Sequence, residues 1–100
     1  MPFAVQIVPS ALAELKAIKV FFRRQIADAI DSQLTQQPTV QSKNRKVLVD
    51  PQPSFDCEPP IWELRVGDYR VFYDVDESAE TVFVRAIRDK PPHATTEEVL

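Results

Sequence analysis

Apolar residues recur at helical spacing through the first third of the chain. Residues 11–37 contain no glycine or proline, and large apolar side chains return every three or four positions, which is typical of an amphipathic helix. The cluster at 19–22 interrupts this pattern, so we expect two helices joined there as a hairpin. Ser10 is the expected N-cap, and Pro38 the expected stop. The periodic apolar positions are Leu12, Leu15, Ile18, Phe22, Ile26, Ile30 and Leu34.

Segments rich in β-branched and aromatic residues flank the helical region. Residues 3–8 predict an opening strand, and three further strands are predicted at 61–66, 69–75 and 81–88. The sequence VGDY at 66–69 suits a type II′ hairpin turn, because glycine at its first central position tolerates a positive φ. The last three strands therefore form an antiparallel meander.

The order of these elements predicts an α+β fold for one domain spanning residues 1–100. It has an N-terminal strand, a helical hairpin and then the meander, which together give a four-stranded sheet with both helices on one face. Residues 38–60 are irregular and rich in proline, although 46–49 allow a short edge strand. We expect the polar tail from Pro91 to be only partly ordered. The second face of the sheet is expected to be open.

Pairing outward from the hairpin turn places Arg65 opposite Arg70. Like charges in such positions destabilise a sheet, but two planar guanidinium groups suit the oxygens of a phosphate. The alternative is that nearby acids, Glu63 first among them, neutralise both arginines. The face directed at the helices carries Trp62, Leu64, Val66, Tyr69, Val71 and Tyr73, and the open face carries Glu63, Arg65, Arg70 and Phe72.

The strand at 81–88 is apolar on both sides, so alternation alone does not assign its faces. If Ala86, Arg88 and Lys90 point outward, they extend the cationic face, with Phe72 available for stacking and the small Ala86 leaving room for a ligand. The neighbouring basic loop then adds Lys43, Arg45 and Lys46.

Composition narrows the chemistry further. The net charge is −3, but the basic residues are grouped, so an acidic total can hide a basic face. One cysteine, Cys57, and one histidine, His93, exclude an internal disulfide and a zinc site. No nucleotide-binding glycine motif or metal cluster is present, and we expect no cofactor. No apolar run reaches membrane-spanning length and no signal peptide opens the chain, so we expect a cytoplasmic protein without membrane contact.

Metal-free RNA cleavage is one reaction that requires no metal ion or cofactor. In metal-free RNA cleavage the 2′-hydroxyl attacks its own phosphate, and the enzyme supplies a base, an acid and cations. His93 follows two prolines near the end of the last strand, where it is a candidate for proton transfer, although an exposed histidine in a tail is usually inert.

The motifs WELRVGDYRVFYDVDE and TVFVRAIRDK, with KNRKVL and the helical hairpin upstream, resemble the RelE/ParE superfamily of bacterial type II toxins. The resemblance implies a toxin held inactive by an antitoxin in a hetero-oligomer. It places Arg70 where RelE-like nucleases stabilise the transition-state phosphate, and makes Lys90 the basic residue after the last strand. Ile61 and Glu63 stand where the RelE type carries lysines, and the tail lacks the tyrosine common in that type.

Three functions follow from the resemblance. The leading hypothesis is a RelE-like nuclease that cuts messenger RNA on the ribosome, with Arg65 and Arg70 on phosphate and Lys90 or His93 moving protons. Its RNA-binding residues are then Lys43, Arg45, Lys46 and Arg88. The second is a ParE-like inhibitor of DNA gyrase, and the third is a toxin fold that only binds an antitoxin.

Overall fold

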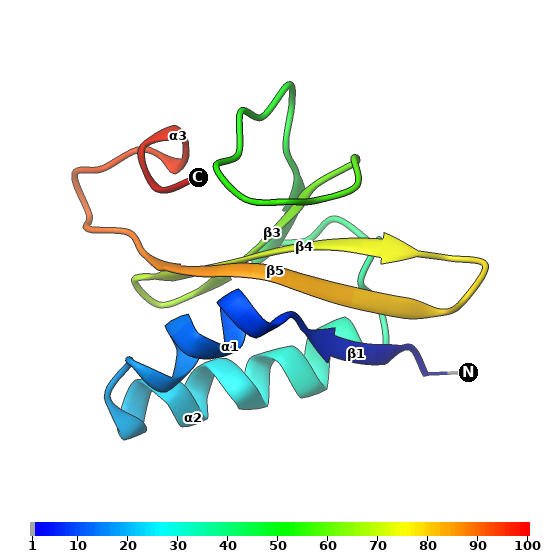
Figure 1. Cartoon of the computed structure of the whole chain (residues 1–100), viewed down its shortest axis with the longest axis horizontal. Helices are drawn as coiled ribbons and strands as arrows, with labels where there is room; N and C mark the ends of the chain where they lie inside the picture. Colours follow the sequence, from blue (N-terminus) through cyan, green and yellow to red (C-terminus); the bar gives the residue numbers. More distant parts are fainter. Residues whose placement is uncertain (1) are drawn as a thin grey trace.

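The computed structural model describes residues 2–100 and contains a five-stranded sheet in the order β1-β5-β4-β3-β2 (Figure 1). Strand β1 pairs in parallel with β5, and the other neighbours are antiparallel. The predicted α+β class is confirmed. The fifth strand, β2, is the short edge strand that the sequence allowed. The bounds are β1 Ala4–Ile7, β2 Arg45–Val47, β3 Trp62–Val66, β4 Tyr69–Asp76 and β5 Thr81–Asp89.

The helical hairpin forms where the apolar pattern breaks. Helix α1 spans Pro9–Lys16 and α2 spans Val20–Ala29, after which a π-helical stretch, η1, continues over Ile30–Leu34. The first helix begins one residue before Ser10, with proline in its first turn and Val8 as the N-cap. Proline suits that place because its missing N–H would have no helical partner there.

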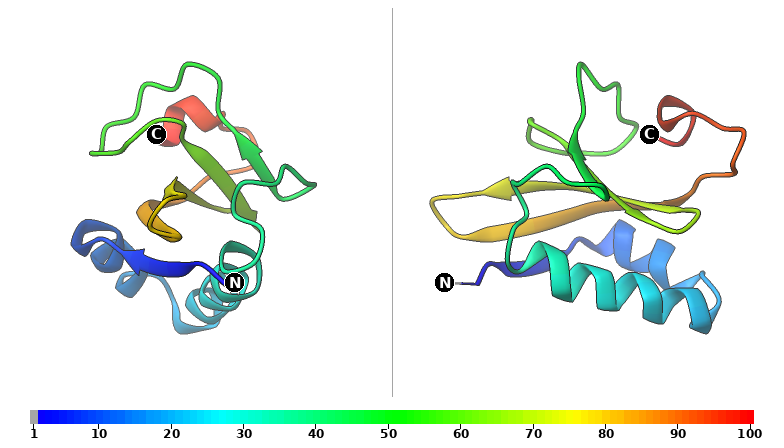
Figure 2. Two further views of the ribbon diagram at one scale, coloured as in Figure 1. Left: turned by 90° about the vertical axis from the view of Figure 1, so that its right-hand side faces the viewer. Right: turned by 180° about the vertical axis from the view of Figure 1, so that it is seen from behind.

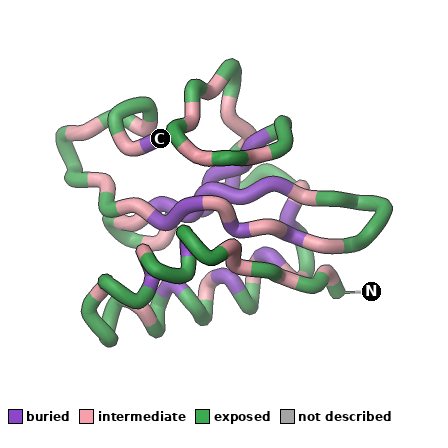
Figure 3. Tube along the Cα trace, in the orientation of Figure 1, coloured by how far each residue is buried: buried purple, intermediate pink, exposed green. Residues whose placement is uncertain are grey.

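Both helices lie on one face of the sheet, and the main core lies between these layers (Figure 2, Figure 3). Tyr73 is at its centre, fully buried, with its ring stacked 6.3 Å from that of Trp62. Its hydroxyl donates a 2.6 Å hydrogen bond to the backbone carbonyl of Pro38. This bond satisfies a buried oxygen and attaches the segment after the helices to the sheet.

A bulge in β5 resolves the ambiguity of that strand. Tyr73 pairs with Val84 but Phe72 pairs with Ala86, so Arg85 is an extra residue on β5. The extra residue reverses the alternation, because two residues of one strand oppose one of the other. Val84 therefore faces the helices, while Ala86 and Arg88 face the other way.

The expectation that the second face is open is wrong. The loop at 48–60 and the tail cross this face, on the side away from the helices (Figure 1, Figure 2). The tail ends in a short helix, α3, at Thr96–Val99, so it is ordered to a greater extent than its polar composition suggested.

Within residues 2–100, none of the helices combines the length and the apolar character needed to cross a membrane.

The hydroxyl of Tyr73 offers a test of this packing. Tyr73→Phe leaves the Pro38 carbonyl buried without its donor, which we expect to lower the free energy of unfolding by about 1–3 kcal/mol. The matched control is Tyr69→Phe, since the Tyr69 side chain is only half-buried. Urea denaturation followed by tryptophan fluorescence measures both. Equal stability of the two variants would contradict the role given to this bond.

Candidate functional site on the sheet face away from the helices

Three arginines form a row across the middle of the sheet. Arg65 of β3 pairs with Arg70 of β4, as predicted, and Arg70 also pairs with Arg88 of β5. Gly67 in the turn between β3 and β4 has a φ of +58°, which glycine adopts without steric cost. The hairpin thus brings the three side chains to one face. We call Arg65, Arg70 and Arg88 the arginine row.

Arg70 is held tightly by its own hairpin. Its Nη1 donates two 2.8 Å hydrogen bonds, to the carbonyls of Gly67 and Tyr69. The residue is 6% exposed, and burial, followed by the positive charge of Arg65, lowers the pKa of Arg70. Its Nε has no hydrogen-bond partner among the described residues. One donor of this guanidinium is therefore unused.

Glu63 supplies the negative charge that the row requires. Its Oε1 lies 3.9 Å from Arg70 Nε and 3.8 Å from Lys46 Nζ, and its Oε2 accepts a 2.9 Å hydrogen bond from Thr96 Oγ1 in the tail. The carboxylate is almost fully buried. The alternative in which acids neutralise both arginines is therefore met for Arg70 only. Arg65 forms no ion pair within residues 2–100.

Arg88 is also engaged within the chain. Its Nε lies 2.8 Å from Glu14 Oε2, although the angle there is outside hydrogen-bond geometry. Its Nη1 donates a 3.2 Å bond to the carbonyl of Val99 in the tail, and its guanidinium lies 5.6 Å from the centre of the Phe55 ring. Arg65 alone of the row is exposed.

A second, smaller core covers the aromatic part of this face. Phe72 is fully buried and its ring stacks on Phe55 at 5.9 Å. Leu100 packs against Phe72 and Ala86, and the Leu100 carbonyl accepts a 3.0 Å hydrogen bond from Ser54 Oγ. The expectations that Phe72 is available for stacking and that Ala86 leaves room for a ligand are wrong. The space above them is filled.

The other predicted site residues are dispersed. Arg45 pairs with Leu64, so it lies on the helix side of the sheet, where it donates to Gln33 Oε1 at 2.7 Å and to the Val40 carbonyl at 3.0 Å. Its neighbour Lys46 lies on the opposite face, beside Glu63. The register of β2 could not be predicted from sequence, and register decides which of two adjacent residues faces which side. Lys43 is exposed before β2.

Within residues 2–100, no hydrogen bond or ion pair links the side chains of Lys90 and His93 to the arginine row. The backbone N–H of Lys90 donates to the Asp68 carbonyl at 2.7 Å, which fixes the chain just after β5. His93 is exposed in a turn of the tail. Within residues 2–100 neither side chain makes a hydrogen bond or ion pair. The proposed acid and base are thus close in sequence to the row, but no hydrogen bond or ion pair among the described residues holds them on it.

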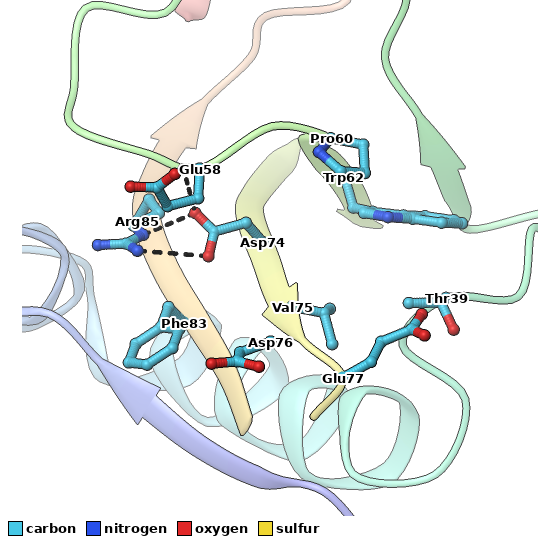
Figure 4. A pocket seen from close by; sticks show the side chains of 10 residues that line it. All are labelled: Thr39, Glu58, Pro60, Trp62, Asp74, Val75, Asp76, Glu77, Phe83 and Arg85. Carbon is cyan, nitrogen blue, oxygen red and sulfur yellow. Dashed lines mark hydrogen bonds and ion pairs between the residues drawn. The ribbon is translucent and has the colours of Figure 1, made fainter. Parts of the chain in front are cut away.

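Sequence reasoning missed a hollow at the other end of the same face (Figure 4). Asp74 and Arg85 form its polar wall, with Arg85 Nε 2.8 Å from Asp74 Oδ2 and the Glu58 N–H donating to the same oxygen at 2.9 Å. The Arg85 guanidinium lies 5.0 Å above the Phe83 ring. Arg85 is the extra residue of the bulge. A strictly alternating strand would not predict that its side chain lies beside Asp74. The hollow has a volume of about 460 Å³ and is lined by Thr39, Glu58, Pro60, Trp62, Asp74, Val75, Asp76, Glu77, Phe83 and Arg85.

The acids of this hollow do not make a metal site. Within the described part of the chain, no three histidine, cysteine, aspartate or glutamate side chains are grouped so as to hold a metal ion. Nearby Cys57 is half-buried, and desolvation, followed by the charge of Asp74, raises the pKa of its thiol. A thiol with a raised pKa is a poor nucleophile at neutral pH, which agrees with an unreactive loop cysteine.

Comparison with known proteins shows what the chain is similar to. The sequence model of the family described as "ParE toxin of type II toxin-antitoxin system, parDE" matches residues 5–90. A comparison with curated protein sequences gives no match.

Among solved structures, the toxin–antitoxin complex RelBE2 of Mycobacterium tuberculosis matches with a TM-score of 0.71 and 17% identity, covering 90% of this chain and 100% of the other. The archaeal RelE–RelB complex of Pyrococcus horikoshii OT3 matches with a TM-score of 0.70 and 20% identity, over 92% and 99%. A mutant of E. coli RelE in the free state matches with a TM-score of 0.56 and 18% identity, over 90% and 84%.

The charge of Glu63 can be tested without removing its hydrogen bond to the tail. Glu63→Gln keeps an acceptor for Thr96 but leaves Arg70 and Lys46 without their counter-charge. We expect it to lower the free energy of unfolding by about 1–3 kcal/mol, because a buried cation is left unpaired.

The matched control is Glu97→Gln, which makes the same charge change at an exposed position. Urea denaturation at low and high salt measures both variants. If Glu63→Gln is as stable as Glu97→Gln, the buried carboxylate does not neutralise the row.

Proposed function

Because the chain belongs to the family of ParE toxins of type II toxin–antitoxin systems, we propose that this toxin acts by binding a protein target, DNA gyrase, and that it does not cut messenger RNA. Inhibition of gyrase is what the resemblance attributes to the ParE branch. One observation carries the proposal. The sheet face that would bind an RNA phosphate is already covered by the loop at 48–60 and the tail.

The arginine row has few free donors for a phosphate. Arg70 is committed to two carbonyls and the Glu63 carboxylate, and Arg88 to Glu14 and the Val99 carbonyl. A phosphate brought to this face would meet a buried negative charge at Glu63. Because like charges repel strongly where water is excluded, the geometry disfavours an RNA backbone here.

The face also lacks a positioned acid and base. Metal-free cleavage needs proton acceptors and donors within about 3 Å of the reacting oxygens. Among the described residues, no hydrogen bond or ion pair links Lys90 or His93 to the row, and residues 91–100 contain no tyrosine. Binding a protein places no such demand on a surface, since complementarity of shape and charge suffices.

A RelE-like nuclease is the second candidate, and one observation favours it. Arg70 Nε is buried and has no hydrogen-bond partner within residues 2–100, and a buried donor of this kind is available to an anion. For a phosphate to reach it, the tail and the Phe55 loop would have to leave the face.

An antitoxin is the expected partner in either case. Two of the similar structures are complexes of a toxin with its antitoxin. We infer that this chain also forms a hetero-oligomer with an antitoxin, whose acidic residues would be attracted to the exposed cations of the toxin.

Purified toxin tests the two candidates directly. We expect it to inhibit DNA supercoiling by gyrase and to leave messenger RNA intact on translating ribosomes. Arg65→Ala is the informative variant, because Arg65 is exposed and its loss does not disturb the core. It should leave gyrase inhibition unchanged to within about twofold, as expected for a surface position outside an interface hot spot.

Toxin mixed beforehand with its antitoxin is the control for specificity. Two results together would overturn the proposal in favour of the nuclease. The wild-type toxin would leave supercoiling unaffected, and it would cleave ribosome-bound RNA much faster than Arg65→Ala does.

A further inference from the structure

The tip of the helical hairpin exposes three consecutive apolar residues. At the start of α2, Val20 is 57% exposed, Phe21 64% and Phe22 38%. Two adjacent exposed phenylalanines are unusual on a monomeric surface, where contiguous apolar patches mark interaction sites. The other large apolar side chains that are exposed in residues 2–100 are separate from one another in the sequence: Leu12, Val40 and Val49.

The two rings are held in place by the fold. Phe22 lies 5.7 Å from the ring of Tyr69 on β4, and Phe21 meets Phe22 edge to face at 5.2 Å with an interplanar angle of 78°. Beside Phe22, a hollow of about 290 Å³ separates α2 from the turn at Gly67 and Asp68. A fixed aromatic pair next to a hollow loses little side-chain entropy when a partner binds.

The tip of the helical hairpin is positively charged, whereas the whole chain has a negative net charge. Between Glu14 and Asp28 the sequence has four basic residues and no acid, while the net charge of the whole chain is −3. Arg23 donates to the Ile18 carbonyl and so supports the turn between the helices. The remaining three are exposed, and none of them forms an ion pair within residues 2–100: Lys16, Lys19 and Arg24.

We propose that this hairpin tip, made of Val20, Phe21, Phe22, Lys16, Lys19 and Arg24, is the surface that docks the protein target of the toxin. The inference rests on the proposed function. Its occupant is an acidic segment of the target with at least one apolar anchor, which inserts beside Phe21 and Phe22 while its carboxylates meet the three cations.

Two observations favour the target as occupant of the tip. A toxin that acts by binding a protein needs a surface with exposed aromatic and basic side chains, because these residues carry most of the binding energy of an interface. The sheet face with the arginine row does not offer one, since its aromatic residues lie beneath the loop and the tail. The tip combines exposed aromatic rings with unpaired cations.

Single substitutions at the tip test the proposal with DNA gyrase as the probe. Phe21→Asp should weaken inhibition of supercoiling by roughly tenfold or more, as expected for loss of an aromatic hot spot. Val49→Asp is the matched control, since Val49 is 87% exposed and lies outside the tip, and it should inhibit like the wild type. Circular dichroism and thermal melting verify that both variants are folded.

The charges are tested separately with Lys19→Glu combined with Arg24→Glu. This double variant should also lose inhibition, and the salt dependence of inhibition should be weaker than for the wild type, because exposed charge pairs are screened by ions. If Phe21→Asp disturbs the hairpin, the double variant still tests the surface, and full inhibition by a folded double variant would contradict the docking surface.

The outcomes separate the two proposals. If the wild-type toxin does not inhibit gyrase, the proposed function fails and the docking inference falls with it. If the wild type inhibits and Phe21→Asp inhibits equally well, the proposed function stands and the docking surface is overturned. Loss of antitoxin binding or of self-association in Phe21→Asp, with gyrase inhibition intact, overturns it too, because the tip then serves the antitoxin or a second copy.

Discussion

The buried carboxylate of Glu63 determines what this sheet face can do. It lies between Arg70 and Lys46 and accepts a hydrogen bond from Thr96, so one side chain both neutralises the cations and fastens the tail. Without it, the arginine row would repel itself across three adjacent strands. With it, Arg70 and Lys46 have a counter-charge, while Arg65 remains exposed without an ion pair among residues 2–100. The tail that Glu63 fastens lies with the loop over Phe72.

This arrangement is the reason why we propose a functional surface on the helices and not on the sheet. One face of the sheet carries the main core beneath α1 and α2, and the other carries the smaller core of Phe72, Ala86 and Leu100. At the hairpin tip, consecutive apolar residues are exposed, and Phe21 and Phe22 lie near cations that form no ion pair within residues 2–100. These features are the basis of our proposal that the toxin binds a protein target and does not act on an RNA phosphate.

Local patterns predicted much of the fold, and long-range contacts account for what they missed. The return of apolar residues every three or four positions located the helical hairpin. The single glycine, Gly67, set the register that brings Arg65 opposite Arg70. The bulge at Arg85 was invisible to alternation. The contact of Leu100 with Phe72 joins segments that are distant in sequence and have no periodicity of their own, so no local rule could reveal that the face is covered.

Hydrogen exchange of the toxin, alone and bound to gyrase, tests the central claim most directly. Amide protection reports which segments open and which become covered. If the sheet face stays closed in the active toxin, binding should slow exchange around residues 16–24 and leave residues 96–100 as protected as in the free protein. Release of the tail on binding, with new protection along β3 and β4, would contradict the account and place the functional surface on the arginine row.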